Sequence, residues 1–124
     1  MSDLQTELKI GLGTLEQEKS MLKPAKVKIV RVSIESTSKA KKVVFECKHP
    51  DRNETVKISS VAFLENKQVK VVGTWFNLDK ESKIQKGSAL HLVLTKLQAN
   101  SISDAVGKDI DTELDNNYLC FKAY

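Results

Sequence analysis

Residues 68–79, QVKVVGTWFNLD, constrain the fold of this chain more than any other stretch. The first valines alternate with Lys70, as they do in a strand with one buried face. Val72 and Gly73 then interrupt the alternation, and the only tryptophan follows beside a phenylalanine. A glycine inside a strand indicates a bulge or the close approach of another backbone. The stretch therefore predicts a strand whose last side chains are re-aimed after Gly73.

The length and composition predict one domain. The chain has 124 residues, 40% of them hydrophobic, which is enough for a core without disulfides or a metal. It contains neither the long apolar run of a membrane span nor a secretory signal, so we expect a cytoplasmic protein with no membrane association. Two cysteines in that setting predict free thiols. We divide the chain into an N-terminal arm, residues 1–23, and a domain, residues 24–124.

The net charge of +4 is unevenly distributed along the chain. Residues 24–108 contain sixteen Lys and Arg and eight acidic residues, whereas residues 1–23 and 109–124 are net acidic. A basic central region is typical of proteins that bind polyanions. The alternative is that the lysines keep the surface soluble and protect sheet edges.

Hydrophobic periodicity predicts a mainly β fold with one helix, in the order β-β-β-β-α-β-β. The expected strands cover residues 26–36, 42–48, 54–59, 68–79, 108–114 and 118–124. In the first strand the alternation shifts between Ile29 and Val30, which predicts a bulge or two partly covered faces.

Ser88 is a good N-cap for the helix, whose leucines recur at helical spacing in ALHLVLTKLQ. A single turn is expected after Ser103. The Asn pair at Asn116 and Asn117 predicts a tight turn with positive φ.

The main candidate site combines aromatic and basic residues. An uninterrupted alternation favours Trp75 inside and Phe76 outside, and a bulge at Gly73 would reverse them. Together with lysines and an arginine, an exposed ring would make a stacking platform in a positive groove, as single-stranded nucleic acid requires. The alternative for the aromatic residues is that both pack in the core. The alternative for the basic residues of the hairpin is that they are simply solvated. Candidate basic residues on the strands are Lys28, Arg31, Lys57 and Lys70, and those on the first hairpin and its following turn are Lys39, Lys41, Lys42, Lys48 and Arg52.

The other groups of polar residues in the sequence do not match a catalytic or metal-binding site. Cys47 and His49 lack the paired short spacings of a zinc site, and no motif supplies an orienting partner for a cysteine nucleophile. The alternating carboxylates from Asp109 to Asp115 fit a solvated face, a cation or basic partner, or pairing with the Lys-rich strands. We therefore expect no enzyme activity, no metal and no cofactor.

The element order, the broken first strand, the basic hairpin TSKAKK and Gly73 before Trp75 resemble an oligonucleotide/oligosaccharide-binding (OB) barrel over residues 24–124. The resemblance implies a small barrel that binds single-stranded DNA or RNA with little sequence preference, through a face that includes Lys28, Arg31, Lys70 and Phe76. The apolar C-terminus lacks the acidic tail of many bacterial single-strand-binding proteins, so a viral, plasmid or archaeal binding protein is expected. The alternative function is a structural or adaptor domain that self-associates or binds a protein partner through open sheet edges.

Overall fold

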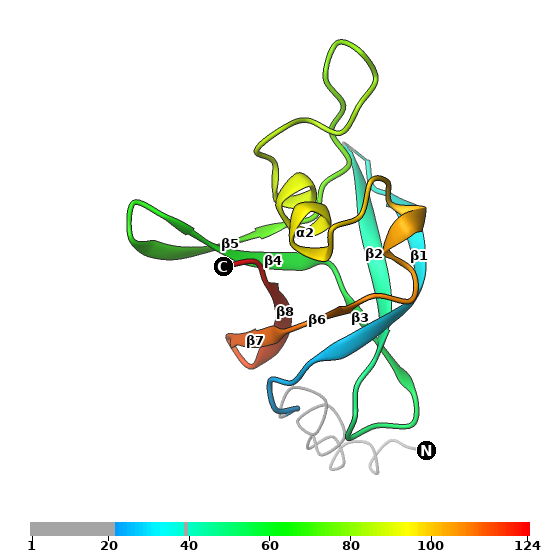
Figure 1. Ribbon diagram of the computed structural model, residues 1–124, viewed down its shortest axis with the longest axis vertical. Coiled ribbons are helices and arrows are strands. Elements are labelled where there is room, and N and C mark those ends of the chain that lie inside the picture. Colours follow the sequence, from blue (N-terminus) through cyan, green and yellow to red (C-terminus); the bar gives the residue numbers. More distant parts are fainter. Residues whose placement is uncertain (1–21, 39) are drawn as a thin grey trace, which may run out of the picture.

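The computed structural model describes residues 22–38 and 40–124, which form two four-stranded sheets and one α-helix (Figure 1). Over these residues the fold is mainly β with one α-helix, as predicted. The first sheet is antiparallel and curled, in the order β3-β2-β1-β6; it contains β1 (Val27–Ser36), β2 (Lys41–Lys48), β3 (Thr55–Ile58) and β6 (Asp109–Ile110). The second is mixed, in the order β5-β4-β8-β7; it contains β4 (Ser60–Glu65), β5 (Gln68–Gly73), β7 (Thr112–Asp115) and β8 (Tyr118–Lys122). The predicted arm, residues 1–23, lies outside the described residues except for its last two positions.

Strand β1 contains the predicted bulge. Its pairing with β2 shifts register between Ile29 and Arg31, which leaves Val30 as the extra residue. Ile29 is fully buried, whereas Val30 is exposed. The extra residue bends the strand and raises its twist, which lets one long strand follow a curled sheet.

The predicted number of strands was wrong, because two chain segments change sheets. The structure has five strands before the helix and three after it. Only Ser59 separates β3, which pairs with β2, from β4, which pairs with β5 and β8. Only Asp111 separates β6, which pairs with β1, from β7, which pairs with β8. The apolar pattern runs through both breaks, so periodicity alone could not locate them.

The strand predicted at residues 68–79 ends early, at Gly73. Residues 74–76 leave β4 and lie beside the start of β2, where the Val43 amide donates to Thr74 O at 2.9 Å and the Phe76 amide donates to Lys41 O at 2.8 Å. The buried Thr74 hydroxyl also donates to Val43 O, at 2.6 Å. This crossing fixes which way the two aromatic side chains point.

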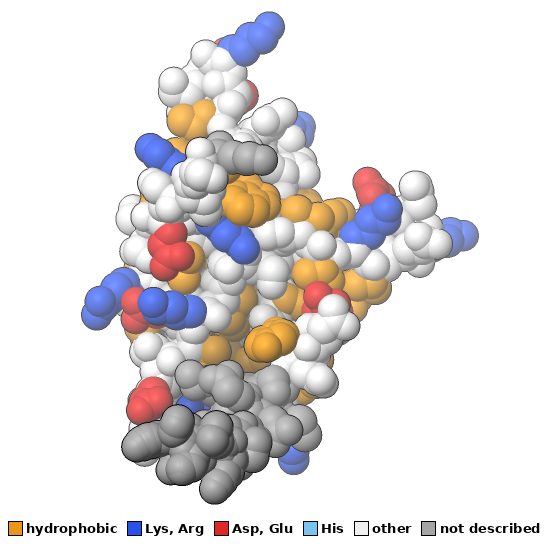
Figure 2. All heavy atoms as spheres, turned by 180° about the vertical axis from the view of Figure 1, so that it is seen from behind, with side chains coloured by type: hydrophobic (Ala, Val, Ile, Leu, Met, Phe, Trp, Pro, Cys, Tyr) orange, Lys and Arg blue, Asp and Glu red, His pale blue; other side chains and the backbone are white. Residues whose placement is uncertain are grey.

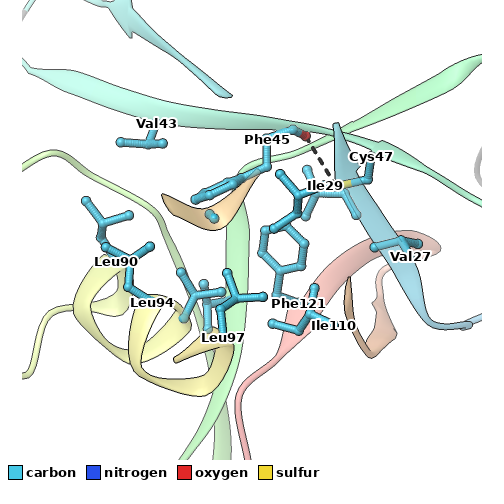
Figure 3. Packing of buried hydrophobic residues seen from close by; sticks show 14 residues of the cluster. Val27, Ile29, Val43, Phe45, Cys47, Leu90, Leu94, Leu97, Ile110 and Phe121 are labelled. Atoms are coloured by element: carbon cyan, nitrogen blue, oxygen red, sulfur yellow. Dashed lines mark hydrogen bonds between the residues drawn. The ribbon is translucent and has the colours of Figure 1, made fainter. Parts of the chain in front are cut away.

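Helix α2 (Ala89–Leu97) was predicted correctly. The Ser88 hydroxyl accepts a hydrogen bond from the His91 amide at 3.2 Å, and Leu90, Leu94 and Leu97 are buried. These leucines enter the core, where Phe45 of β2 meets Phe121 of β8 edge to face, with centroids 5.1 Å apart (Figure 3). The two sheets therefore share one core, and the helix packs against it.

The predicted turns are also present. Asn116 and Asn117 adopt φ of 53° and 69° between β7 and β8, and a 3₁₀ turn covers Ser103–Ala105. Among the described residues, no helix is both long and apolar enough to cross a membrane.

Candidate nucleic-acid interface

The first sheet has one outward-facing surface, which we call the outer face. Residues directly opposite each other on paired strands point to the same side, and alternate residues point to opposite sides. Val43, Phe45 and Cys47 of β2 point into the core. The alternate residues of β2, from Lys42 to Lys48, therefore point outward, together with their cross-strand partners. The outer face comprises Lys28, Arg31, Ser33, Glu35, Lys42, Glu46, Lys48, Thr55, Lys57, Trp75 and Asp109, together with Val44, whose side chain is buried.

Lys42 and Trp75 form one end of the outer face. They are directly opposite each other in an antiparallel bridge, and the Lys42 ammonium lies 5.0 Å from the centroid of the indole ring. Gly73 leaves room for this contact, since a Cβ there would lie 3.0 Å from both Lys42 Cε and Trp75 Nε1 and would require these side chains to shift by a few tenths of an ångström. The indole is half-buried, so part of its surface stays accessible beside a cation. Such a pair offers a stacking surface and a positive charge at one point.

The five cations of the outer face differ in their present partners. Lys28 pairs with Asp109 at 3.3 Å, and Lys48 donates to the carbonyls of Arg52 and Asn53, at 3.1 and 2.9 Å. Within the described residues, the other three have no carboxylate at ion-pair distance; they are Arg31, Lys42 and Lys57.

Acidic side chains lie among these cations. Glu46 lies between Arg31 and Lys57 in the same cross-strand row, and Glu35 is opposite Lys42. Glu46 lies an even number of residues from Lys42 and Lys48 on the same strand, so the sequence could have placed it on their face; Glu35 is placed there by the pairing of β1 with β2. Figure 2 shows that, over the side turned away in Figure 1, Lys and Arg are interspersed with carboxylates and hydrophobic side chains. The surface is moderately positive rather than a continuous basic channel.

The remaining predicted site residues lie elsewhere. Lys70 is on the projecting β4–β5 hairpin and pairs with Glu65 at 3.3 Å. Phe76 packs against the core, on the opposite side of the segment from Trp75, so the alternation beyond Gly73 predicted the reverse orientation. Arg52 contacts Glu54 at 3.8 Å in the turn after β2, and Lys41 is exposed at the end of β2. Lys39 is outside the described residues.

The carboxylate stripe pairs with the Lys-rich first strand, one of the possibilities left open by the sequence. Asp109 contacts Lys28, and Asp111 contacts Lys26, both at 3.3 Å. Glu113 accepts a hydrogen bond from the Tyr124 hydroxyl. Two of these acids therefore pair with lysines at the start of the domain, and a third contacts the last described residue, Tyr124.

The cysteines and His49 are buried, and the ring nitrogens of His49 make hydrogen-bond contacts with the backbone. Burial raises the pKa of the Cys47 thiol to about 12 and that of Cys120 to about 11, so both are poor nucleophiles near neutral pH. Buried His49 bridges the chain, with Nε2 2.7 Å from Lys23 O and Nδ1 accepting from the Asp51 amide at 3.0 Å. In the described part of the chain, no group of three or more His, Cys, Asp or Glu is placed to hold a metal.

Comparison with known proteins found no match to this chain among protein-family models, curated proteins or solved structures.

Proposed function

We propose that this protein is a non-enzymatic binder of single-stranded DNA or RNA with little sequence preference, which uses the outer face of the first sheet. The observation that carries the proposal is the Lys42–Trp75 pair at one end of a face to which three strands contribute cations. An aromatic ring can stack on any base, and lysine and arginine contact phosphates without reading sequence.

The strand pairings support the proposal that the two sheets together form an OB-type barrel. If β3 with β4 and β6 with β7 are each taken as one bent strand, the pairings run β1, β2, β3/β4, β8, β7/β6 and back to β1. The parallel pairing of β4 with β8 and the antiparallel pairing of β6 with β1 favour this description, although the pairings divide into two sheets. In OB barrels, oligonucleotides bind on the face of the second and third strands. Here those strands carry Lys42, Lys48 and Lys57.

The charges predict modest, salt-dependent affinity. Three cations on the outer face lack carboxylate partners among the described residues, and contacts to three phosphates give a slope of log K against log salt of about −2 for a single strand. Glu35 and Glu46 weaken the local positive potential, and the ion pair with Asp109 competes with phosphate for Lys28.

A fluorescence titration tests this proposal. Oligodeoxythymidylate of about 12 nucleotides, the range that one OB domain covers, should quench Trp75 and bind more weakly as salt rises. Arg31→Glu should reduce affinity about tenfold. The matched control is Lys70→Glu, the same type of charge reversal on the projecting hairpin, and it should change affinity little. Absence of binding at ~50 mM salt, or equal effects of the two variants, would refute the proposal.

A second candidate function is self-association through the β4–β5 hairpin. Strand β5 is at the end of its sheet, and three hydrophobic side chains of the hairpin, Leu64, Val69 and Val72, are between 41% and 53% exposed. An open strand edge with apolar side chains is suited to pairing with the same edge of a second copy. Light scattering should then give a dimer mass that Val69→Lys reduces to a monomer, and a monomer for the unaltered protein would exclude this function.

A further inference from the structure

A groove of about 890 Å³ lies between residues 76–84 and the C-terminal half of helix α2 with its following residues. Its floor is apolar: Phe76, Ile84 and Leu94 all belong to or pack against the core cluster. The size is in the range of sites that hold small ligands. The sequence analysis did not identify this groove, because its two walls are separate in the chain.

Hydrogen bonds within the chain stabilise both walls. On one side, Asp79 Oδ1 accepts from the amides of Glu81 and Lys83, at 2.8 and 3.0 Å, and these bonds lower the pKa of the Asp79 carboxyl. On the other side, Gln98 ends the helix in the left-handed region, and its amide donates to carbonyls of the last helical turn. The groove is therefore a built feature of the fold.

The chemistry of the lining fits part of a nucleic-acid strand. Among the described residues that line it, Lys83 and His91 are the only titratable ones, and none is Asp or Glu. The loop of residues 80–86 adds positive charge, with three lysines and one glutamate. An apolar floor with a phenylalanine ring suits a base, and the amide side chains of Gln98 and Asn100 in the lining can hydrogen-bond to base edges.

The groove begins next to the outer face. Trp75 belongs to that face and Phe76 to the groove, and both are held beside the start of β2, where Lys42 is opposite Trp75 and the Phe76 amide donates to the carbonyl of the exposed Lys41. A strand stacked on Trp75 would have to cross this segment to reach the groove, because Trp75 and Phe76 point to its opposite sides. We infer that the groove binds a further nucleotide of the same strand, with its base on Phe76 and its phosphate near Lys83. This inference rests on the proposed function and extends it to a second subsite.

Two variants test the groove without altering the outer face. Phe76→Leu keeps an apolar side chain on the core and removes the ring, and it should weaken binding of oligodeoxythymidylate of about 12 nucleotides roughly tenfold. Thr95→Glu adds a carboxylate at an exposed helical position that lines the groove, and it should weaken the same oligonucleotide about fivefold. Neither variant should affect an oligonucleotide of about 4 nucleotides, the low end of the site size, bound at Trp75 alone.

Lys96→Glu is the matched control, because it changes the charge of the adjacent, exposed helical position, which does not line the groove. General electrostatic repulsion would make Lys96→Glu at least as harmful as Thr95→Glu, and that result would overturn the inference. Unchanged affinity of Phe76→Leu for the longer oligonucleotide, with Trp75 still quenched, would overturn it while leaving the proposed function intact. No binding of either oligonucleotide by the unaltered protein would overturn both.

Discussion

At the scale of single residues, Gly73 determines the geometry of the candidate site. The glycine is the last residue of β5, where the chain leaves β4 for β2. Its missing side chain leaves room for the Lys42 stem and the Trp75 indole to pack over the backbone. The requirement is steric, since the contacts at 3.0 Å are closer than Cβ atoms normally allow.

Gly73→Ala should therefore displace the Lys42–Trp75 pair. We expect a red shift of tryptophan emission and a loss of about 1 kcal/mol in the free energy of unfolding, the lower end of the cost of overpacking. Fluorescence spectra and urea denaturation provide the measurements. Val72→Ala, at the exposed neighbouring position, should leave the emission unchanged; an unshifted spectrum for Gly73→Ala would mean that Gly73 does not position the ring.

At the scale of elements, two hairpins use the same type of turn with different residues. The β7–β8 turn has Asn at both central positions, whereas the β4–β5 turn has Asn66 at φ 54° and Lys67 at φ 67°. Two successive positive φ values are typical of the type I′ turn, which favours Asn-Gly. Lysine has a Cβ that makes the left-handed region unfavourable.

Lys67→Gly should therefore stabilise the protein, by about 1 kcal/mol, because it removes the left-handed strain in the second turn position. The midpoint of urea denaturation should rise. Lys67→Ala retains a Cβ, and this control should give no such gain. A lower midpoint for Lys67→Gly would show that the flexibility of glycine in the unfolded chain outweighs the relief of strain.

At the scale of the whole molecule, the contact between Phe45 and Phe121 joins the two sheets. Both rings are fully buried, and each comes from a different sheet. Helix α2 adds leucines to the same cluster, so neither sheet has a separate core. We expect the described part of the chain to unfold in one cooperative transition.

A double-mutant cycle measures this coupling. Phe45→Leu and Phe121→Leu should each destabilise the protein, and their effects should be non-additive by about 1 kcal/mol, the value of an edge-to-face aromatic pair. The comparison cycle combines Phe121→Leu with Leu78→Ala on the exposed loop, and those effects should add. Additive effects for the two phenylalanines would mean that the sheets are not coupled through this contact.

Sequence patterns correctly predicted the features that depend on residues adjacent in the chain. The alternation shift at Ile29 located the bulge, Ser88 located the start of the helix, and the Asn pair located a positive-φ turn. Bulges, caps and tight turns depend on the conformations of a few consecutive residues, so their signals are local.

The pairing of the strands and the contacts between distant side chains could be seen only in the tertiary structure. The strand breaks at Ser59 and Asp111 arise because the chain changes sheets there, and the orientation of Trp75 follows from the pairing of residues 74–76 with β2. The same folding brings Lys42 to the indole, moves Lys70 onto the projecting hairpin and forms the groove at Phe76. These contacts join positions far apart in the chain, and periodicity describes only how a side chain points relative to its own strand.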